Sequence, residues 1–177
     1  MAFVVLNWGY ILITTFLCGF AFARFVEKVF CYQVSNLVEM LFFGLVIATV
    51  YAQIFSFFGC VGLAANLILY GVCLLIFLVW RKKITAFLYA KLFVRSVLYK
   101  ITIVIIGVIW CYCTSRGYMH YDSDLYHAQS IRWIEEYGIV KGLGNIHVRF
   151  AYNSSIFALS ALYSMREIAG QSLHTIN

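Results

Sequence analysis

Residues 37–80 read LVEMLFFGLVIATVYAQIFSFFGCVGLAANLILYGVCLLIFLVW. The stretch contains two apolar runs, at about residues 37–58 and 60–80, and residues 56–62 are the only place between them where the chain can turn. Two glycines within that segment favour a tight hairpin. Because about 20 apolar residues suffice for a helix to cross roughly 30 Å of hydrocarbon, the stretch predicts two membrane spans joined by a short turn.

Two more apolar runs flank this pair of spans. Residues 1–23 contain no charge before Arg24 and lack the basic start and shorter core of a cleaved signal peptide, so they predict a retained span. A fourth span is expected at roughly residues 97–113, with Lys100 reaching to the membrane surface at its start. The 177 residues are 64% hydrophobic and 11% charged, with a mean hydropathy of +0.90, which does not fit a water-facing surface. The sequence therefore predicts an all-α polytopic transmembrane helical protein with about four spans, a multi-pass protein of the inner (cytoplasmic) membrane.

The basic residues gather at the ends of the apolar runs, which indicates a role in membrane topology and argues against nucleic-acid binding despite a net charge of +6. Residues 81–100 carry six Lys or Arg and no acid, whereas residues 116–149 mix four basic with four acidic residues. By the positive-inside rule the first segment is cytoplasmic and the second lies outside. We expect residues 81–100 to form an interfacial helix within a transmembrane region of residues 1–115, and residues 116–177 to form an extracytoplasmic loop.

The last part of the chain begins another apolar element. Residues 153–165 are apolar but too short to span a membrane, and Arg166 and Glu167 interrupt them. We interpret this segment as the start of a following apolar segment. The chain is therefore expected to be the N-terminal part of a longer protein.

Residues 120–127 read HYDSDLYH and place two carboxylates and two imidazoles directly after the fourth apolar run. Asp122 and Asp124, with His127 one helical turn further on, can hold a divalent cation. Alternatively, one carboxylate acts as a base that the other orients. Capping of a helix is the purely structural role open to Asp122.

Helical periodicity over residues 123–137 predicts a juxtamembrane helix after this motif, with Asp122 as its N-cap and Gly138 as its C-terminal stop. Its aromatic residues share one stripe that we expect to rest on lipid headgroups or on the tops of neighbouring spans: Tyr126, Trp133 and Tyr137. Its charged residues occupy the opposite side: Asp124, Arg132, Glu135 and Glu136. The carboxylates of the motif then stand at the helix N-terminus, near the exit of the fourth span.

Residues 140–149 read VKGLGNIHVR and form a glycine-broken loop with a basic edge. Lys141, His147 and Arg149 can receive a phosphate or pyrophosphate, and Arg149 is best suited to bidentate contact. The alternative is that the glycines only make turns and the cations meet lipid headgroups.

Taken together, residues 122–138 (DSDLYHAQSIRWIEEYG), residues 142–149 (GLGNIHVR) and the pair Asn153-Ser154 resemble an uncharacterised family of bacterial polytopic membrane proteins. More distantly, the chain resembles the GT-C superfamily of membrane glycosyltransferases. Those enzymes carry an acidic motif in an extracytoplasmic loop just after a transmembrane helix, and they take sugars from polyprenyl-phosphate donors. The close resemblance covers about residues 121–155, whereas the N-terminal spans match only in hydrophobicity.

The resemblance implies that Asp122, four residues before a Tyr-His pair, is the catalytic carboxylate and that Asp124 is its helper. It implies a substrate-binding role for five further residues: His127, Arg132, His147, Arg149 and Asn153. A divalent metal ion, where one is used, would be held by Asp122, Asp124 and His127. The expected partners are membrane lipid and a lipid-linked sugar donor, with no nucleic acid.

The leading interpretation is a membrane glycosyltransferase. Asp122 deprotonates or orients an acceptor hydroxyl that attacks the anomeric carbon of a lipid-linked sugar, and Arg149 or His147 stabilises the departing phosphate. An O-antigen polymerase or ligase, also polytopic and lipid-linked, is the nearest alternative. The opposed class is a transporter subunit or membrane scaffold without enzymatic activity, in which charged residues deep within the spans are expected; this chain has few.

Overall fold

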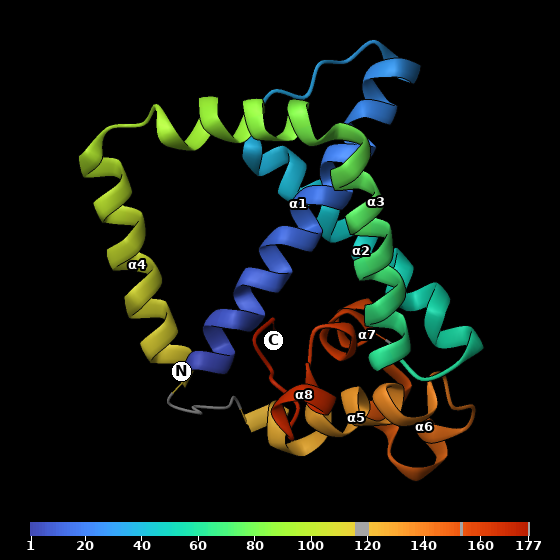
Figure 1. Ribbon diagram of the computed structural model, residues 1–177. Coiled ribbons are helices and arrows are strands. Elements are labelled where there is room, and N and C mark those ends of the chain that lie inside the picture. Colours follow the sequence, from blue (N-terminus) through green and yellow to red (C-terminus); the bar gives the residue numbers. More distant parts are fainter. Residues whose placement is uncertain (116–120, 153, 177) are drawn as a thin grey trace. The chain divides into compact units, whose positions relative to one another are not determined.

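The computed structural model describes residues 1–115, 121–152 and 154–176, apart from the side chains of Phe93 and Asp124. Every regular element in these residues is helical, which confirms the all-α fold class (Figure 1). In chain order the elements are α1 (Ala2–Phe30), α2 (Leu37–Phe58), α3 (Leu63–Leu88), η1 (Tyr89–Phe93), α4 (Val97–Ser115), η2 (Ser123–His127), α5 (Ala128–Tyr137), α6 (Leu143–Ile146), η3 (Val148–Tyr152), α7 (Ser155–Leu162) and α8 (Arg166–Ala169). The short elements η1 and η2 are π-helical, and η3 is a 3-10 helix.

Four helical stretches in the described part of the chain are long and apolar enough to cross a membrane: Ala2–Phe30, Leu37–Phe58, Leu63–Leu92 and Val97–Ser115. They coincide with the four predicted runs, although the first continues beyond its predicted end at residue 23 and the third beyond its predicted end at residue 80. The chain is therefore a multi-pass membrane protein.

The chain divides into two compact units. One consists of residues 1–44 and 71–118, and the other of residues 45–70 and 119–177. Helices α2 and α3 each contribute one part to each unit. The first unit contains α1, α4 and the basic segment, whereas the second contains the acidic motif and the C-terminal helices.

In the first unit, α1 and α2 cross at two glycines. A Cβ atom on Gly19 would overlap the Met40 carbonyl, and one on Gly44 would overlap the Thr15 carbonyl. The absence of a side chain at both positions lets the two backbones approach closely, as small residues do between membrane helices. The hydroxyl of Thr15 does not compete for this contact, because it donates to the Ile11 carbonyl of its own helix at 2.6 Å.

Helix α3 is kinked at Trp80, which has non-helical dihedral angles (φ −113°, ψ 17°). Its ring packs against Phe20 of α1, with the ring centroids 6.4 Å apart. Beyond the kink, Phe87 packs against Phe16 and Phe20 at 6.1 and 6.3 Å. Aromatic contacts with α1 thus hold the segment after the kink in its new direction (Figure 1).

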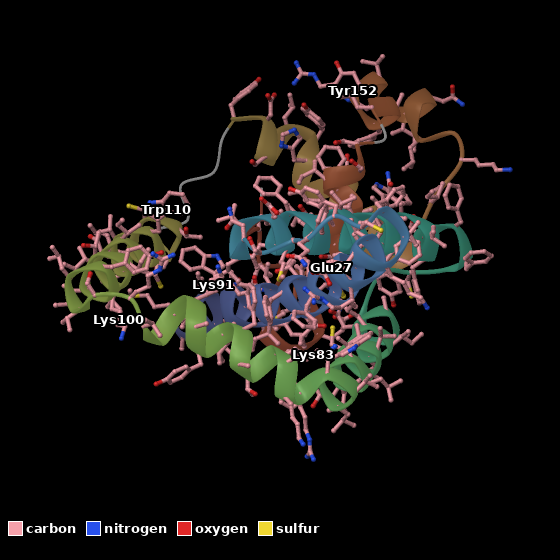
Figure 2. The ribbon with its side chains drawn as sticks, turned by 90° about the horizontal axis from the view of Figure 1, so that it is seen from above. Glu27, Lys83, Lys91, Lys100, Trp110 and Tyr152 are labelled. Atoms are coloured by element: carbon pink, nitrogen blue, oxygen red, sulfur yellow. The ribbon has the colours of Figure 1, made fainter. Side chains whose placement is uncertain are left out.

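The basic segment, predicted as one interfacial helix over residues 81–100, is divided into two. The helix continues from α3 through η1, and α4 starts after a short break. Ser96 explains the break, because its side-chain oxygen accepts the Tyr99 backbone N–H at 3.3 Å and so caps the start of α4. Figure 2 labels three basic residues along these helices: Lys83, Lys91 and Lys100.

In the second unit, the turn between α2 and α3 is hydrogen bonded to the end of α5. The Val61 N–H donates to the Ile134 carbonyl at 3.0 Å, and the Ile139 N–H donates to the Ser56 carbonyl at 2.9 Å. This turn is the hairpin that the sequence predicts. It therefore lies at the same end of these helices as the end of α5.

The apolar segment that is too short to span a membrane forms α7 and lies in the core of the second unit. Its residues from Phe157 to Leu162 are buried, with Leu159 1% and Leu162 0% exposed. Asn66 of α3 donates its side-chain N–H to the Leu162 carbonyl at 2.9 Å. A polar residue near the start of the third span thus satisfies an end carbonyl of α7 and joins the two helices.

Candidate functional site

The acidic motif lies in a helix whose first turn differs from the prediction. Elements η2 and α5 together cover residues 123–137, as predicted, and Gly138 ends the helix with a φ of 71° and an N–H bonded to the Ile134 carbonyl at 3.1 Å. Asp122 directly precedes η2, at the predicted N-cap position, but it has helical dihedral angles (φ −68°, ψ −22°) and makes no side-chain capping hydrogen bond. Its carboxylate binds a guanidinium from the following loop instead.

Arg149 provides that guanidinium and connects the two predicted motifs. Its Nη1 donates to Oδ1 of Asp122 at 3.0 Å, an ion pair that bridges 27 residues. Its guanidinium carbon lies 5.3 Å from the centre of the Tyr126 ring, so the cation is held by a carboxylate and an aromatic face. The side chains of Arg149 and Asp122 are 37% and 32% exposed, which leaves the pair accessible to a ligand.

The two described histidines of the motifs have different surroundings. The ring of His127 packs against those of Tyr126 and Phe157, with centroid distances of 4.3 and 5.1 Å. His147 uses its Nδ1 to accept the backbone N–H of Arg149 at 3.3 Å. His127 therefore belongs to an aromatic cluster, whereas His147 orders the loop that carries the arginine.

Arg132, a predicted substrate-binding residue, takes part in a second ion-pair cluster. Its Nε lies 2.7 Å from Oε1 of Glu136, one turn along the helix, and Nη1 of Arg166 lies 3.0 Å from the same oxygen. Two parts of the predicted site lie outside the described part of the chain, namely Asn153 and the side chain of Asp124. The described residues thus unite the first acid of the motif with the basic edge of the loop.

The same residues bear on the metal prediction. Within residues 1–115, 121–152 and 154–176, no group of three His, Cys, Asp or Glu side chains is arranged to hold a metal ion. Asp122 has the Arg149 guanidinium beside it, and this charge disfavours a second cation at the same carboxylate. The metal set of Asp122, Asp124 and His127 stays a prediction, because the side chain of Asp124 is not described.

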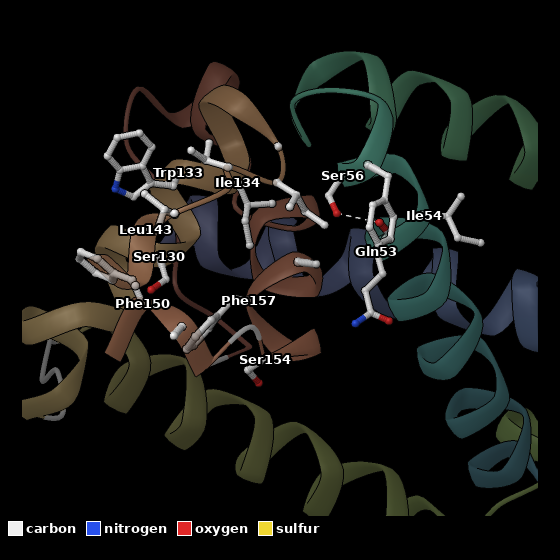
Figure 3. Close-up of a pocket in the computed structure, with 18 of the residues that line it drawn as sticks. Gln53, Ile54, Ser56, Ser130, Trp133, Ile134, Leu143, Phe150, Ser154 and Phe157 are labelled. Atoms are coloured by element: carbon white, nitrogen blue, oxygen red, sulfur yellow. Dashed lines mark hydrogen bonds between the residues drawn. The ribbon is translucent and has the colours of Figure 1, made fainter. Parts of the chain in front are cut away.

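A cavity of about 550 Å³ lies in the second unit, and the loop that carries Arg149 forms part of its wall. Figure 3 shows Gln53 and Ser56 of α2 on one side of it, and Ser130 of α5 and Phe150 of the loop on the other. Most of the lining is apolar: Val50, Ile54, Phe57, Trp133, Leu143 and Phe157. An apolar cavity of this size with a few polar groups is typical of a small-molecule site.

Glu135 is buried, although the helical pattern predicts it on the charged face together with Arg132. Only 2% of its side chain is exposed. Ser172 donates to its Oε2 at 2.8 Å, and Arg166 Nη1 lies 3.9 Å from the same atom, whereas Oε1 has no partner among the described residues. The C-terminal segment that supplies these contacts covers a face that the local pattern indicates as polar. The sequence feature that could have indicated this covering segment is the Arg166-Glu167 pair, which interrupts the last apolar run.

His174 lies in the same C-terminal segment. Burial lowers its pKa below the usual value of 6.5, and the negative charge of Glu135 acts in the opposite direction. Burial therefore favours the neutral imidazole. Sequence reasoning gave no role to Ser172 or His174, since nothing in the local pattern indicates that they approach α5.

The chain belongs to the family described as Domain of unknown function (DUF8201), which matches residues 1–177. No curated protein and no solved structure matches the chain. Because the family match extends over both compact units, the membrane spans and the acidic motif belong to one family domain. A functional proposal therefore depends on the residues themselves.

Proposed function

We propose that this family member is a membrane glycosyltransferase of the inner membrane that moves a sugar from a polyprenyl-phosphate-linked donor to an extracytoplasmic acceptor. The observation that carries the proposal is the 3.0 Å contact between Asp122 and Arg149. Each residue has a separate predicted task in sugar transfer, and the fold brings the two together from segments 27 residues apart.

The chemistry needs a base and an anion-binding group close to each other. The Asp122 carboxylate accepts the proton of the acceptor hydroxyl, whose oxygen forms a bond to the anomeric carbon of the sugar. The bond between that carbon and the phosphate oxygen breaks, and its electron pair leaves with the phosphate. Arg149 stabilises the negative charge of the departing phosphate, for which a guanidinium is the best-suited side chain.

The cavity supports a lipid-linked donor rather than a soluble nucleotide sugar. Its α2 wall includes Val50, Ile54 and Phe57, which lie on a membrane-spanning helix and remain partly exposed. An apolar chain from the bilayer can therefore reach the cavity without crossing water. The loop wall includes Phe150, which follows Arg149 in the sequence, and the phosphate of such a donor would bind at this arginine.

Transfer assays on membranes that contain the full-length protein test the proposal. Loss of sugar from a panel of polyprenyl-phosphate sugars is the readout. Asp122→Asn and Arg149→Gln should each lower the rate on the order of a hundredfold or more, because one removes the base and the other the leaving-group cation. Asp124→Asn should have a smaller effect.

Glu136→Gln is the matched control. It removes one negative charge from the same helix, at a carboxylate that pairs with Arg132 and Arg166 instead of Arg149. This variant should keep most of the activity. If Asp122→Asn and Asp124→Asn both retain full transfer, the enzymatic interpretation of the motif is wrong; if only Asp124→Asn loses it, the base is Asp124.

A further inference from the structure

The two groups that the proposed reaction needs are bound to each other in this structure. The acceptor hydroxyl must meet the Asp122 carboxylate, and the donor phosphate must meet the Arg149 guanidinium. With Nη1 of Arg149 donating to Oδ1 of Asp122, that oxygen faces the guanidinium instead of an acceptor. Binding of the donor phosphate to this N–H of Arg149 therefore requires that the pair separates.

A phosphate can cause this separation. Both side chains are about one third exposed, and ion pairs with this exposure are weak because water screens them. A phosphate group offers the guanidinium several oxygens and a bidentate geometry, and it binds more strongly than a single carboxylate oxygen. An arriving phosphate is thus able to replace Asp122 as the partner of Arg149.

Arg149 is held in place by contacts that do not involve Asp122. The Tyr126 ring lies 5.3 Å from the guanidinium carbon, and the backbone N–H of Arg149 donates to Nδ1 of His147 at 3.3 Å. Tyr126 is itself only 9% exposed. These contacts keep the guanidinium in position when the carboxylate leaves, so Asp122 is the group that is exchanged.

We propose that the donor phosphate replaces Asp122 on Arg149 and thereby releases the carboxylate for the acceptor. The inference rests on the proposed function for its biological meaning, but the exchange is a binding property that is measured without any transfer. It implies an order of substrate binding: the donor binds first and makes the base available, and the acceptor follows.

Equilibrium binding to the purified chain in lipid nanodiscs tests the exchange, with farnesyl phosphate as the probe at fixed ionic strength. Asp122→Asn removes the competing carboxylate, so it should tighten binding by about three-fold, the factor that corresponds to an exposed ion pair. Arg149→Gln should weaken binding about tenfold. In the double variant, Asp122→Asn should add nothing to the effect of Arg149→Gln.

Three controls separate exchange from other causes. Glu136→Gln makes the same charge change away from Arg149 and should leave the affinity unchanged. Farnesol has the same chain without the phosphate and should bind the parent chain and Asp122→Asn equally. Inorganic phosphate should compete with farnesyl phosphate, because the headgroup is the part that Arg149 recognises.

The inference is overturned if Asp122→Asn fails to tighten binding, or if it tightens binding equally when Arg149 is already Gln. Circular dichroism of each variant establishes that it is folded, and Arg149→Lys, which keeps the charge but loses the planar fork, should show intermediate affinity. Exchange without any sugar transfer would remove the proposed function and leave this inference standing. Sugar transfer without exchange would support the proposed function and overturn this inference.

Discussion

The two ends of the helix formed by η2 and α5 place carboxylates in opposite environments. Asp122, at the first end, is about one third exposed and forms an ion pair with Arg149. Glu135, at the other end, is 2% exposed and contacts Ser172 and Arg166 of the C-terminal segment. An exposed pair contributes about 0–1 kcal/mol to stability, whereas breaking a buried arrangement costs several times more. We infer that the first end is available for chemistry and the second end anchors the helix.

The two ends of this helix also differ in whether backbone or side-chain contacts hold them. The second end is hydrogen bonded to the turn between α2 and α3 through Ile134 and Ile139. The first end is held by side chains, chiefly the packing of Tyr126 against His127, Tyr152 and Phe157. A helix that is fixed at one end by its backbone can change the partners of side chains at its other end without losing its place in the fold.

The largest effect is expected at Gly138, in the anchored end. Its φ of 71° with ψ of −141° is a conformation that only glycine adopts easily, and a Cβ atom there would lie 2.6 Å from the Ser56 carbonyl oxygen. Gly138→Ala should lower the free energy of unfolding by about 3 kcal/mol. Unfolding in mixed detergent micelles measures this change.

Gly142→Ala is the control for that variant. Gly142 also has a positive φ, of 86°, but a Cβ atom there would meet only the side chain of Asn145 at 3.6 Å. The cost should therefore be backbone strain alone, about 1 kcal/mol. Equal costs at the two glycines would show that the contact with the α2–α3 turn does not anchor the helix.

The second prediction compares the two carboxylates directly. Glu135→Ala leaves a buried space and removes the acceptor of the Ser172 hydroxyl, so it should lower the free energy of unfolding by about 2 kcal/mol. Asp122→Ala should cost less than about 1 kcal/mol. Farnesyl phosphate binding should respond in the opposite order, changing with Asp122→Ala and not with Glu135→Ala. If both variants are equally destabilised, the distinction between the two ends is lost.

The elements that the sequence predicts well are those determined by local composition. Four long apolar runs predict the four spans, and the glycine after Tyr137 predicts the end of the helix. In each case a short stretch of sequence is enough for the prediction, because the length of an apolar run and the conformation of a glycine depend on neighbouring residues.

The parts that the sequence does not predict depend on contacts between distant segments. Local pattern makes Asp122 a capping residue, but its carboxylate is bound to Arg149, 27 residues away, and makes no side-chain capping hydrogen bond. Glu135 has the polarity of a surface residue, and it is buried because residues beyond Ser164 cover it. Helical periodicity describes the residues of one helix only, so it predicts neither the Asp122–Arg149 ion pair nor the burial of Glu135.

The third prediction concerns Tyr126, which supports Arg149 at the exposed end. Replacing its ring removes the cation–π contact, worth about 0.5–1 kcal/mol at such a site, so Tyr126→Leu should weaken farnesyl phosphate binding by about three-fold. Tyr126→Phe keeps a ring of the same shape and should bind as the parent chain does. Equal weakening by both variants would show that the hydroxyl of Tyr126, and not its ring, supports Arg149.

The smallest effect is expected at His174, next to the anchored end. Burial lowers its pKa in the folded chain below the unfolded value near 6.5, so the unfolded chain binds more protons as the pH falls below that value. Stability from this residue is therefore complete above about pH 6.5 and decreases at lower pH. The thermal midpoint of the parent chain should fall more between pH 7.5 and 5.5 than that of His174→Gln. Because the charge of Glu135 opposes the shift, Glu135→Gln should enlarge the difference between chains with and without His174. Identical pH profiles with and without His174 would show that the C-terminal segment does not bury the imidazole against α5.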